Sequence, residues 1–186
     1  MNLQGTKTEQ NLLKAFAGES QARNRYSYFA NQARKDGFEN IARQFEETAN
    51  QEKEHARMFF SFLTGGTLEI TASFPAGKIR STVENLKAAI EGEHMEYSDL
   101  YPYFAKVARE EGFMNVANLF DRISIAEKQH EKQFQDLVFD IENQRVFSRD
   151  SNAQWKCLNC GYVHNGMDAP KACPVCAYPQ SHFTVI

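Results

Sequence analysis

The feature that most constrains the fold of this chain is an internal repeat. Residues 28–55 and 103–130 align without a gap at an offset of 75, with 13 of 28 positions identical. Both copies contain a Gly-Phe pair at the same position, residues 37–38 and 112–113, and both finish with Glu-Lys-x-His. Within each copy the apolar residues recur every three or four positions, which is typical of the buried face of an α-helix. Two homologous helical hairpins are therefore predicted, because shared helix-forming composition alone would not match the turns and the terminal histidines.

The two hairpins together predict a bundle. Thr6, followed three residues later by Glu9, has the pattern of a capping box at the start of the first helix. Glycines at positions 37, 65, 66 and 112 mark the turns and helix ends. The stretch 64–81 between the hairpins suits the long crossover connection of ferritin-like bundles. We expect an all-α, ferritin-like four-helix bundle with this crossover between helices two and three.

The end of the chain has a different composition. Residues 152–186 are rich in turn-forming residues and contain all four cysteines. In a reducing compartment such a cluster is more often a metal site than a pair of disulfides. Two domains are predicted, a bundle at 1–147 and a small four-cysteine metal domain at 152–186.

Charge and hydropathy argue against several partners. The formal net charge of -3 provides no basic surface for nucleic acid. No apolar run approaches the roughly 18 residues that a membrane span requires. The first ten residues, MNLQGTKTEQ, lack the apolar stretch of a signal peptide. We expect a cytoplasmic protein that binds neither nucleic acid nor membrane.

Six polar residues interrupt the apolar helix faces at corresponding places. They are Glu19 on the first helix, Glu52 and His55 on the second, Glu93 on the third, and Glu127 and His130 on the fourth. Taken singly, such a glutamate is more often an edge residue and such a histidine a hydrogen-bonded core group. As a set they would bury several unpaired carboxylates, at a cost of several kcal/mol each. Two divalent cations remove that cost, and the set matches the ligands of ferritin-like di-iron proteins.

Glu96, one helical turn beyond Glu93, is an additional carboxylate for the same site. The negative charge of these five glutamates exceeds the positive charge of a diferrous pair but not that of a diferric pair. Glu96 therefore favours the oxidised state, whereas neutral His55 is the better partner for ferrous iron. Tyr26 and Tyr101, on the first and third helices, are expected either as core aromatics or as groups that support the ligands.

The repeat has one misfit. At the offset of 75, Glu19 aligns with His94 and not with Glu93. A one-residue insertion between Glu93 and Tyr103 explains the mismatch, and a helix absorbs such an insertion most easily as a π-bulge. His94 would then point about 100° away from Glu93, so it is expected at the surface.

Two Cys-x-x-Cys pairs can hold one tetrahedral metal. The four candidate ligands are Cys157, Cys160, Cys173 and Cys176. Zinc and iron both suit this spacing, and zinc is the commoner occupant among proteins. However, Gly161-Tyr162 and the Cys-Pro-x-Cys second pair resemble rubredoxin, which holds one redox-active iron, so we favour iron over a structural zinc. About 35 residues cannot bury much core, and the metal is expected to hold the domain together.

Over nearly its whole length the chain resembles rubrerythrin. The resemblance rests on GESQARNRY around Glu19, QEKEH around Glu52, GEHMEY around Glu93 and AEKQH around Glu127, together with the DGF and EEGF turns and the cysteine domain. It implies a non-haem di-iron peroxidase that reduces hydrogen peroxide to water as oxidative-stress defence. It also implies that one iron exchanges His55 for Glu96 on oxidation.

The same resemblance implies cofactors and partners. Three irons per chain are expected, two in the bundle and one in the cysteine domain, with zinc as an alternative occupant of either site in the isolated protein. Electrons would come from NAD(P)H through separate carriers, such as a rubredoxin or an NAD(P)H-linked reductase. A head-to-tail homodimer, or a larger assembly, would bring the cysteine-bound iron of one subunit to the bundle of its partner.

A peroxidase has two alternatives, of which only the first stays open. A ferritin-like protein that oxidises and stores iron would use the same bundle, but it would not require an attached electron carrier. A helical scaffold with a zinc knuckle would not require the buried carboxylates. The physiological electron donor, the metals loaded and the preference for peroxide over oxygen stay open at this point.

Overall fold

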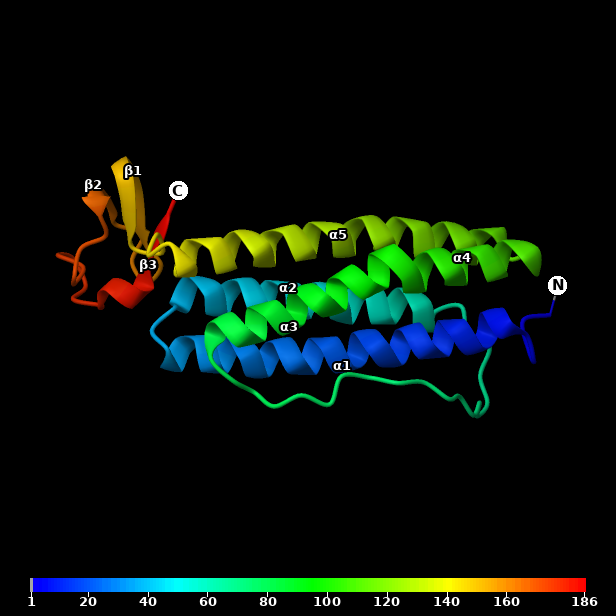
Figure 1. Cartoon of the computed structure of the whole chain (residues 1–186). Helices are drawn as coiled ribbons and strands as arrows, with labels where there is room; N and C mark the ends of the chain where they lie inside the picture. Colours follow the sequence, from blue (N-terminus) through cyan, green and yellow to red (C-terminus); the bar gives the residue numbers. More distant parts are fainter. Residues whose placement is uncertain (1) are drawn as a thin grey trace.

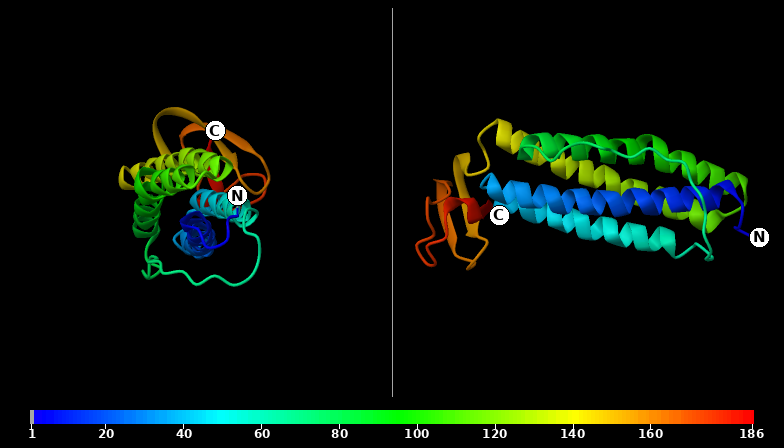
Figure 2. Two further views of the ribbon diagram at one scale, coloured as in Figure 1. Left: turned by 90° about the vertical axis from the view of Figure 1, so that its right-hand side faces the viewer. Right: turned by 90° about the horizontal axis from the view of Figure 1, so that it is seen from below.

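The computed structural model describes residues 2–186. The helical part consists of α1 (Lys7–Lys35), α2 (Glu39–Phe60), α3 (Thr82–Met95), the π-helical turn η1 (Glu96–Leu100), α4 (Tyr101–Glu110) and α5 (Met114–Glu142). Because α3, η1 and α4 follow one another without a break, they form a single long helix, and the described residues build a four-helix bundle (Figure 1). The crossover between α2 and α3 runs along the outside of the bundle from one end to the other (Figure 2). The predicted fold is confirmed.

The helix beginnings show how the two hairpins hold each other. At the start of α1, Thr6 Oγ1 accepts a hydrogen bond from the backbone of Glu9 at 3.1 Å, which is one half of the predicted capping box. The Glu9 side chain accepts from the backbone of Gly5, and not from that of Thr6, at 2.8 Å. The next contacts come from the opposite hairpin, because Glu111, in the turn between α4 and α5, accepts from both the backbone and the hydroxyl of Thr8. Asp36, in the turn between α1 and α2, accepts in the same way from Thr82 at the start of α3. Each hairpin turn therefore caps the first helix of the other hairpin.

The bundle core has two apolar parts. One is built around Phe29, Phe45 and Phe134, and the other around Phe104 and Phe120. Full burial of such a side chain stabilises the fold by about 1.5–3 kcal/mol. Both parts are made of residues from both hairpins, so the hairpins share one interior.

The C-terminal segment forms a small antiparallel sheet. Its strands are β1 (Ser148–Cys157), β2 (Val163–Asp168) and β3 (Phe183–Val185), in the order β2-β1-β3, with a 3-10 turn, η2 (Gln180–His182), before β3. Trp155 and Phe183 are its largest buried side chains. The sheet lies at the end of the bundle where α2 begins and α5 ends (Figure 1), and Arg43 of α2 donates to the carbonyl of Leu158 at 3.1 Å.

Two further predictions concern membrane-spanning helices and the domain limits. Among residues 2–186 no helix is both long and apolar enough to cross a membrane. The predicted domain limits, 1–147 and 152–186, stay a prediction, and residue 1 lies outside the described residues.

Candidate metal centres

The structure brings six predicted ligands together in the middle of the bundle. Their side-chain donor atoms form two overlapping groups, each with all atoms within 4.8 Å of one another. One group contains Glu19, Glu52, His55 and Glu127, and the other contains Glu52, Glu93, Glu127 and His130. Two carboxylates shared between two donor groups are the arrangement that two neighbouring metal ions require if carboxylates bridge them.

Both imidazoles face this cluster through Nδ1. His55 Nδ1 lies 2.8 Å from Glu127 Oε1 and 3.2 Å from Glu52 Oε2. His130 Nδ1 lies 2.7 Å from Glu127 Oε2 and 3.0 Å from Glu52 Oε1. The Glu-x-x-His spacing produces this geometry, because residues three apart on a helix share one face.

The outer nitrogens, Nε2, of the two histidines differ in their contacts. His130 Nε2 lies 3.0 Å from Gln51 Oε1, a contact that fixes the ring. The repeat places Ala126 at the position equivalent to Gln51, and alanine cannot make this contact for His55. Sequence reasoning missed Gln51, although the Gln-to-Ala difference between the two copies is a visible signal.

The cluster is closed to water and short of positive charge. Glu19, Glu52, Glu93 and Glu127 are fully buried. Glu19 Oε2 and Glu93 Oε2 have no hydrogen-bond donor among the described residues. Buried carboxylates without partners are unstable unless cations or protons neutralise them, so the residues present fit a pair of divalent metal ions.

The pKa values show what the cluster does without cations. Burial, with repulsion from Glu52, raises the pKa of Glu93 to about 8, and it raises the pKa of Glu19 well above the usual range. Burial alone would lower the pKa of both imidazoles, but hydrogen bonds to Glu127 and Glu52 outweigh it. The pKa of His55 rises to about 10 and that of His130 to about 12. Protons therefore take the place that metal ions would occupy, and metal binding must displace them.

Tyr26 and Tyr101 support two of the carboxylates across the hairpin boundary. The Tyr26 hydroxyl donates to Glu93, and the Tyr101 hydroxyl donates to Glu19. Burial and the nearby carboxylates raise the pKa of both phenols well above 10, so both remain donors. They are core aromatics and carboxylate partners at once.

Glu96 lies beside the cluster, outside its two donor groups. It is the first residue of η1, which supplies the predicted π-bulge, and it is 9% exposed. Burial, with repulsion from Glu93, raises its pKa well above the usual range. His94 is exposed, as expected, and contacts Glu131 at 3.1 Å.

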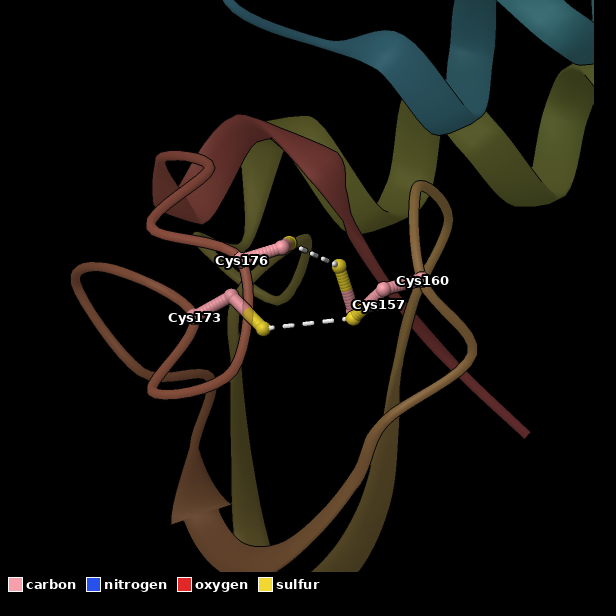
Figure 3. Close-up of side chains that lie close together, drawn as sticks. All are labelled: Cys157, Cys160, Cys173 and Cys176. Carbon is pink, nitrogen blue, oxygen red and sulfur yellow. Dashed lines mark hydrogen bonds between the residues drawn. The ribbon is translucent and has the colours of Figure 1, made fainter.

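The four cysteines converge at the end of β1 and in the loop before β3 (Figure 3). The Sγ atoms of Cys157 and Cys176 lie 3.7 Å apart, and those of Cys160 and Cys173 lie 3.6 Å apart. These distances are far too long for disulfides. A tetrahedron of metal–sulfur bonds of about 2.3 Å has sulfur–sulfur edges of about 3.8 Å, so the four thiols fit one metal ion.

The bundle with its carboxylate–imidazole cluster, followed by a four-thiol sheet domain, defines a ferritin-like di-iron protein with a rubredoxin-like domain. The rubrerythrin family model matches residues 10–138, and the model described as "Rubrerythrin, rubredoxin-like domain" matches residues 155–184. The chain belongs to the rubrerythrin family.

Individual relatives cover nearly all of the chain. Rubrerythrin from Nitratidesulfovibrio vulgaris is 55% identical over 185 residues, which are 100% of this chain and 97% of the relative. Rubrerythrin from Porphyromonas gingivalis is 56% identical and covers 98% of this chain and 91% of its own. Among solved structures, the fully reduced, all-ferrous state of nigerythrin aligns with a TM-score of 0.66 at 33% identity, covering 99% of this chain and 91% of that chain.

Proposed function

We propose that this protein is a peroxidase that reduces hydrogen peroxide to water, with electrons delivered through the four-cysteine centre. The observation that carries the proposal is the presence, in one chain, of two overlapping carboxylate–imidazole groups and a four-thiol metal site. Neither an iron store nor a structural zinc protein requires both. The proposed di-iron ligands are Glu19, Glu52, His55, Glu93, Glu96, Glu127 and His130, and the proposed ligands of the third iron are Cys157, Cys160, Cys173 and Cys176.

The protein's own groups have separate tasks in this reaction. When bound, a ferrous pair supplies the two electrons that break the O–O bond. The reaction also consumes two protons, and Glu96 is suited to hold one at its carboxylate because burial raises its pKa. Tyr26 and Tyr101 hold Glu93 and Glu19 in place. The buried setting excludes bulk water from the reacting groups.

An exchange of His55 for Glu96 on oxidation remains part of the proposal. It is supported by the unequal fixing of the two histidines, since Gln51 holds His130 through Nε2. His55 has no equivalent contact in the described residues and is the freer of the two to leave. The position of Glu96, next to the cluster but outside its donor groups, suits a ligand that joins in only one redox state.

Electron delivery is proposed to cross between subunits. His130 is twelve residues from the end of α5 at Glu142, which is about 18 Å along the helix axis. The cysteine domain begins beyond that end (Figure 1). A head-to-tail homodimer, or a larger assembly, would shorten the path by placing the cysteine iron of one subunit against its partner's bundle. A rubredoxin or an NAD(P)H-linked reductase is the proposed source of electrons, and a cytoplasmic location stays a prediction.

The test is a comparison of oxidants. The anaerobically reduced, iron-loaded protein is mixed with hydrogen peroxide or with oxygen, and the oxidation of the di-iron site is followed by stopped-flow absorption. We expect peroxide to react at least about tenfold faster and at one equivalent per iron pair. Faster reaction with oxygen, with continued uptake of added ferrous iron, would instead support the ferroxidase alternative. Metal analysis tests the expected three irons per chain against zinc.

A further inference from the structure

A cavity of about 290 Å³ lies under the crossover, against α1 and the long third helix. Its inner wall includes Glu96 and Tyr101, the residues of the candidate site that it reaches. Its outer wall is formed by the crossover residues 71–75. The volume exceeds that of several water molecules, each of which takes about 30 Å³.

Two glycines line the cavity. A methyl group on Gly18 would lie 3.8 Å from Phe74 Cε1 and 3.9 Å from Glu96 Oε1. The aromatic ring of the crossover and the carboxylate therefore approach the same point of α1, and any larger side chain at Gly18 would fill the space between them. A methyl group on Gly92 of α3 would lie 3.8 Å from Arg25 Nη2. Arg25 lines the same cavity and provides a cationic group near Glu96.

The outer wall is a strap without helix or strand. Residues 71–80 are all exposed, and Gln21 Nε2 ties the strap to α1 by donating to the carbonyl of Pro75 at 3.3 Å. Phe74, next to that anchor, is 40% exposed although its ring borders the cavity. It is the bulkiest side chain that the strap contributes to the cavity wall.

We propose that this cavity is the route by which peroxide reaches the di-iron site, and that Phe74 sets the size of the molecule that passes. The proposal rests on the proposed peroxidase function. A route that ends at Glu96 and Tyr101 delivers a small neutral hydroperoxide to the side of the cluster on which Glu96 lies outside the two donor groups. The apolar ring at the mouth admits such a molecule and hinders hydroperoxides with large organic groups.

The test widens and narrows the mouth. Phe74→Ala widens it, and Ala72→Trp, at an exposed strap residue that also lines the cavity, narrows it. Ile79→Ala is the matched control, because Ile79 lies on the same segment, is 52% exposed and does not line the cavity. Two rates are measured on the iron-loaded proteins. One is single-turnover oxidation of the reduced site by hydrogen peroxide or by cumene hydroperoxide, and the other is azide association with the oxidised site, followed by absorption.

We expect Phe74→Ala to oxidise at least about tenfold faster with cumene hydroperoxide than Ile79→Ala does, which is the size of effect that steric changes of a few methylene groups produce. Its rate of oxidation by hydrogen peroxide should change by less than about twofold. Ala72→Trp should slow both the oxidation by hydrogen peroxide and the association of azide. If Phe74→Ala and Ala72→Trp match Ile79→Ala in all rates, the route is wrong. Azide separates this failure from that of the proposed function. A wild-type protein that is unreactive to peroxide, but whose azide association follows the size of the strap residues, would retain the route and lose the peroxidase assignment.

Discussion

Tyr26 on α1 donates its hydroxyl hydrogen to Glu93 on α3, so a residue of one hairpin fixes a candidate metal ligand of the other. The reciprocal bond joins Tyr101 to Glu19. Glu93 and Glu19, the two carboxylates outside the Glu-x-x-His pairs, thus each accept a hydrogen bond from a tyrosine of the opposite hairpin. The ligand cluster and the docking of the hairpins depend on the same contacts.

Tyr26→Phe should lower the free energy of unfolding by about 1–3 kcal/mol, because it leaves a buried carboxylate oxygen without its donor. Tyr28→Phe, on the same helix at a residue that is 52% exposed, is the matched control and should be near neutral. Denaturant unfolding of the metal-loaded proteins measures both. Equal stabilities for the two variants would show that the hydrogen bond contributes nothing.

The metal-free protein should lose stability as the pH rises. Burial raises the pKa of Glu93 to about 8, and hydrogen bonds to carboxylates, outweighing burial, raise that of His55 to about 10. A group whose pKa is raised by folding stabilises the fold below its unfolded pKa and loses this contribution as the pH climbs to the folded pKa. Unfolding free energies should therefore fall between about pH 5 and pH 10. A rise over this window would contradict the prediction.

Metal binding should release protons from the same groups. Zinc, which is redox-inert, can be titrated into the metal-free protein at pH 7 in buffers of different ionisation enthalpy. Zinc also fills the four-thiol site, so Glu127→Ala, which should not bind the metal pair, is titrated as the control. We expect the wild type to release more than one proton per chain beyond this control, since both imidazoles must lose a proton before Nδ1 can bind a metal. The apparent affinity should rise with pH. A buffer dependence equal to that of Glu127→Ala would mean that the imidazoles are already neutral.

Cys160→Ser should abolish the red-brown thiolate-to-iron absorption of the oxidised cysteine domain and leave the bundle folded. The reason is that the sheet and the bundle have separate apolar cores. Visible absorption measures the first effect and far-ultraviolet circular dichroism the second. A colourless wild-type protein with one zinc per chain in this domain would remove the electron-carrier role.

Glu96→Ala and Glu127→Ala should have different effects on the di-iron site. Glu127 belongs to both donor groups, so its loss should prevent binding of the metal pair in either redox state. Loss of Glu96 should disfavour only the oxidised state and raise the di-iron reduction potential by about 60 mV, a tenfold effect for a one-electron couple. Glu91→Ala, at an exposed residue of α3, is the control. An unchanged potential in Glu96→Ala would mean that Glu96 is not a ligand.

Delivery between subunits can be tested with two inactive variants. Glu127→Ala and Cys160→Ser are co-expressed with different tags, and the mixed dimer is isolated. Transfer within a chain predicts no peroxide turnover, because neither chain has both centres. Transfer between chains predicts up to about half of wild-type turnover, from one intact path of two. An inactive mixed dimer that retains its remaining metals would refute the cross-subunit path.

The sequence predicted most of the fold and the composition of the cluster because both follow from helical periodicity. The spacing of Glu52 to His55 and of Glu127 to His130 determines which side chains share a face, and the one-residue misfit near His94 indicated the π-helical turn. These are local properties, which a repeat makes visible twice.

What the sequence did not predict depends on how separate segments meet. The hydrogen bonds that Asp36 accepts from Thr82 and Glu111 accepts from Thr8 form only when the two hairpins pack together. The contact of Gln51 with His130 joins two helices far apart in the chain. The cavity depends on the path of a crossover that has no periodic pattern. None of these contacts has a signature within a single segment.

The exchanged acid caps have a consequence for the ancestry of the chain. A hairpin on its own would lack the carboxylate that its first helix receives from the other hairpin, and it would have a tyrosine without its carboxylate and half of a ligand cluster. Two copies of one hairpin, associating about a twofold axis, would supply all three to each other. The present chain is therefore equivalent to such a pair joined in one chain. The crossover then replaces a concentration-dependent encounter between two molecules with an intramolecular one, and this frees the two copies to diverge, as Gln51 and Ala126 have done.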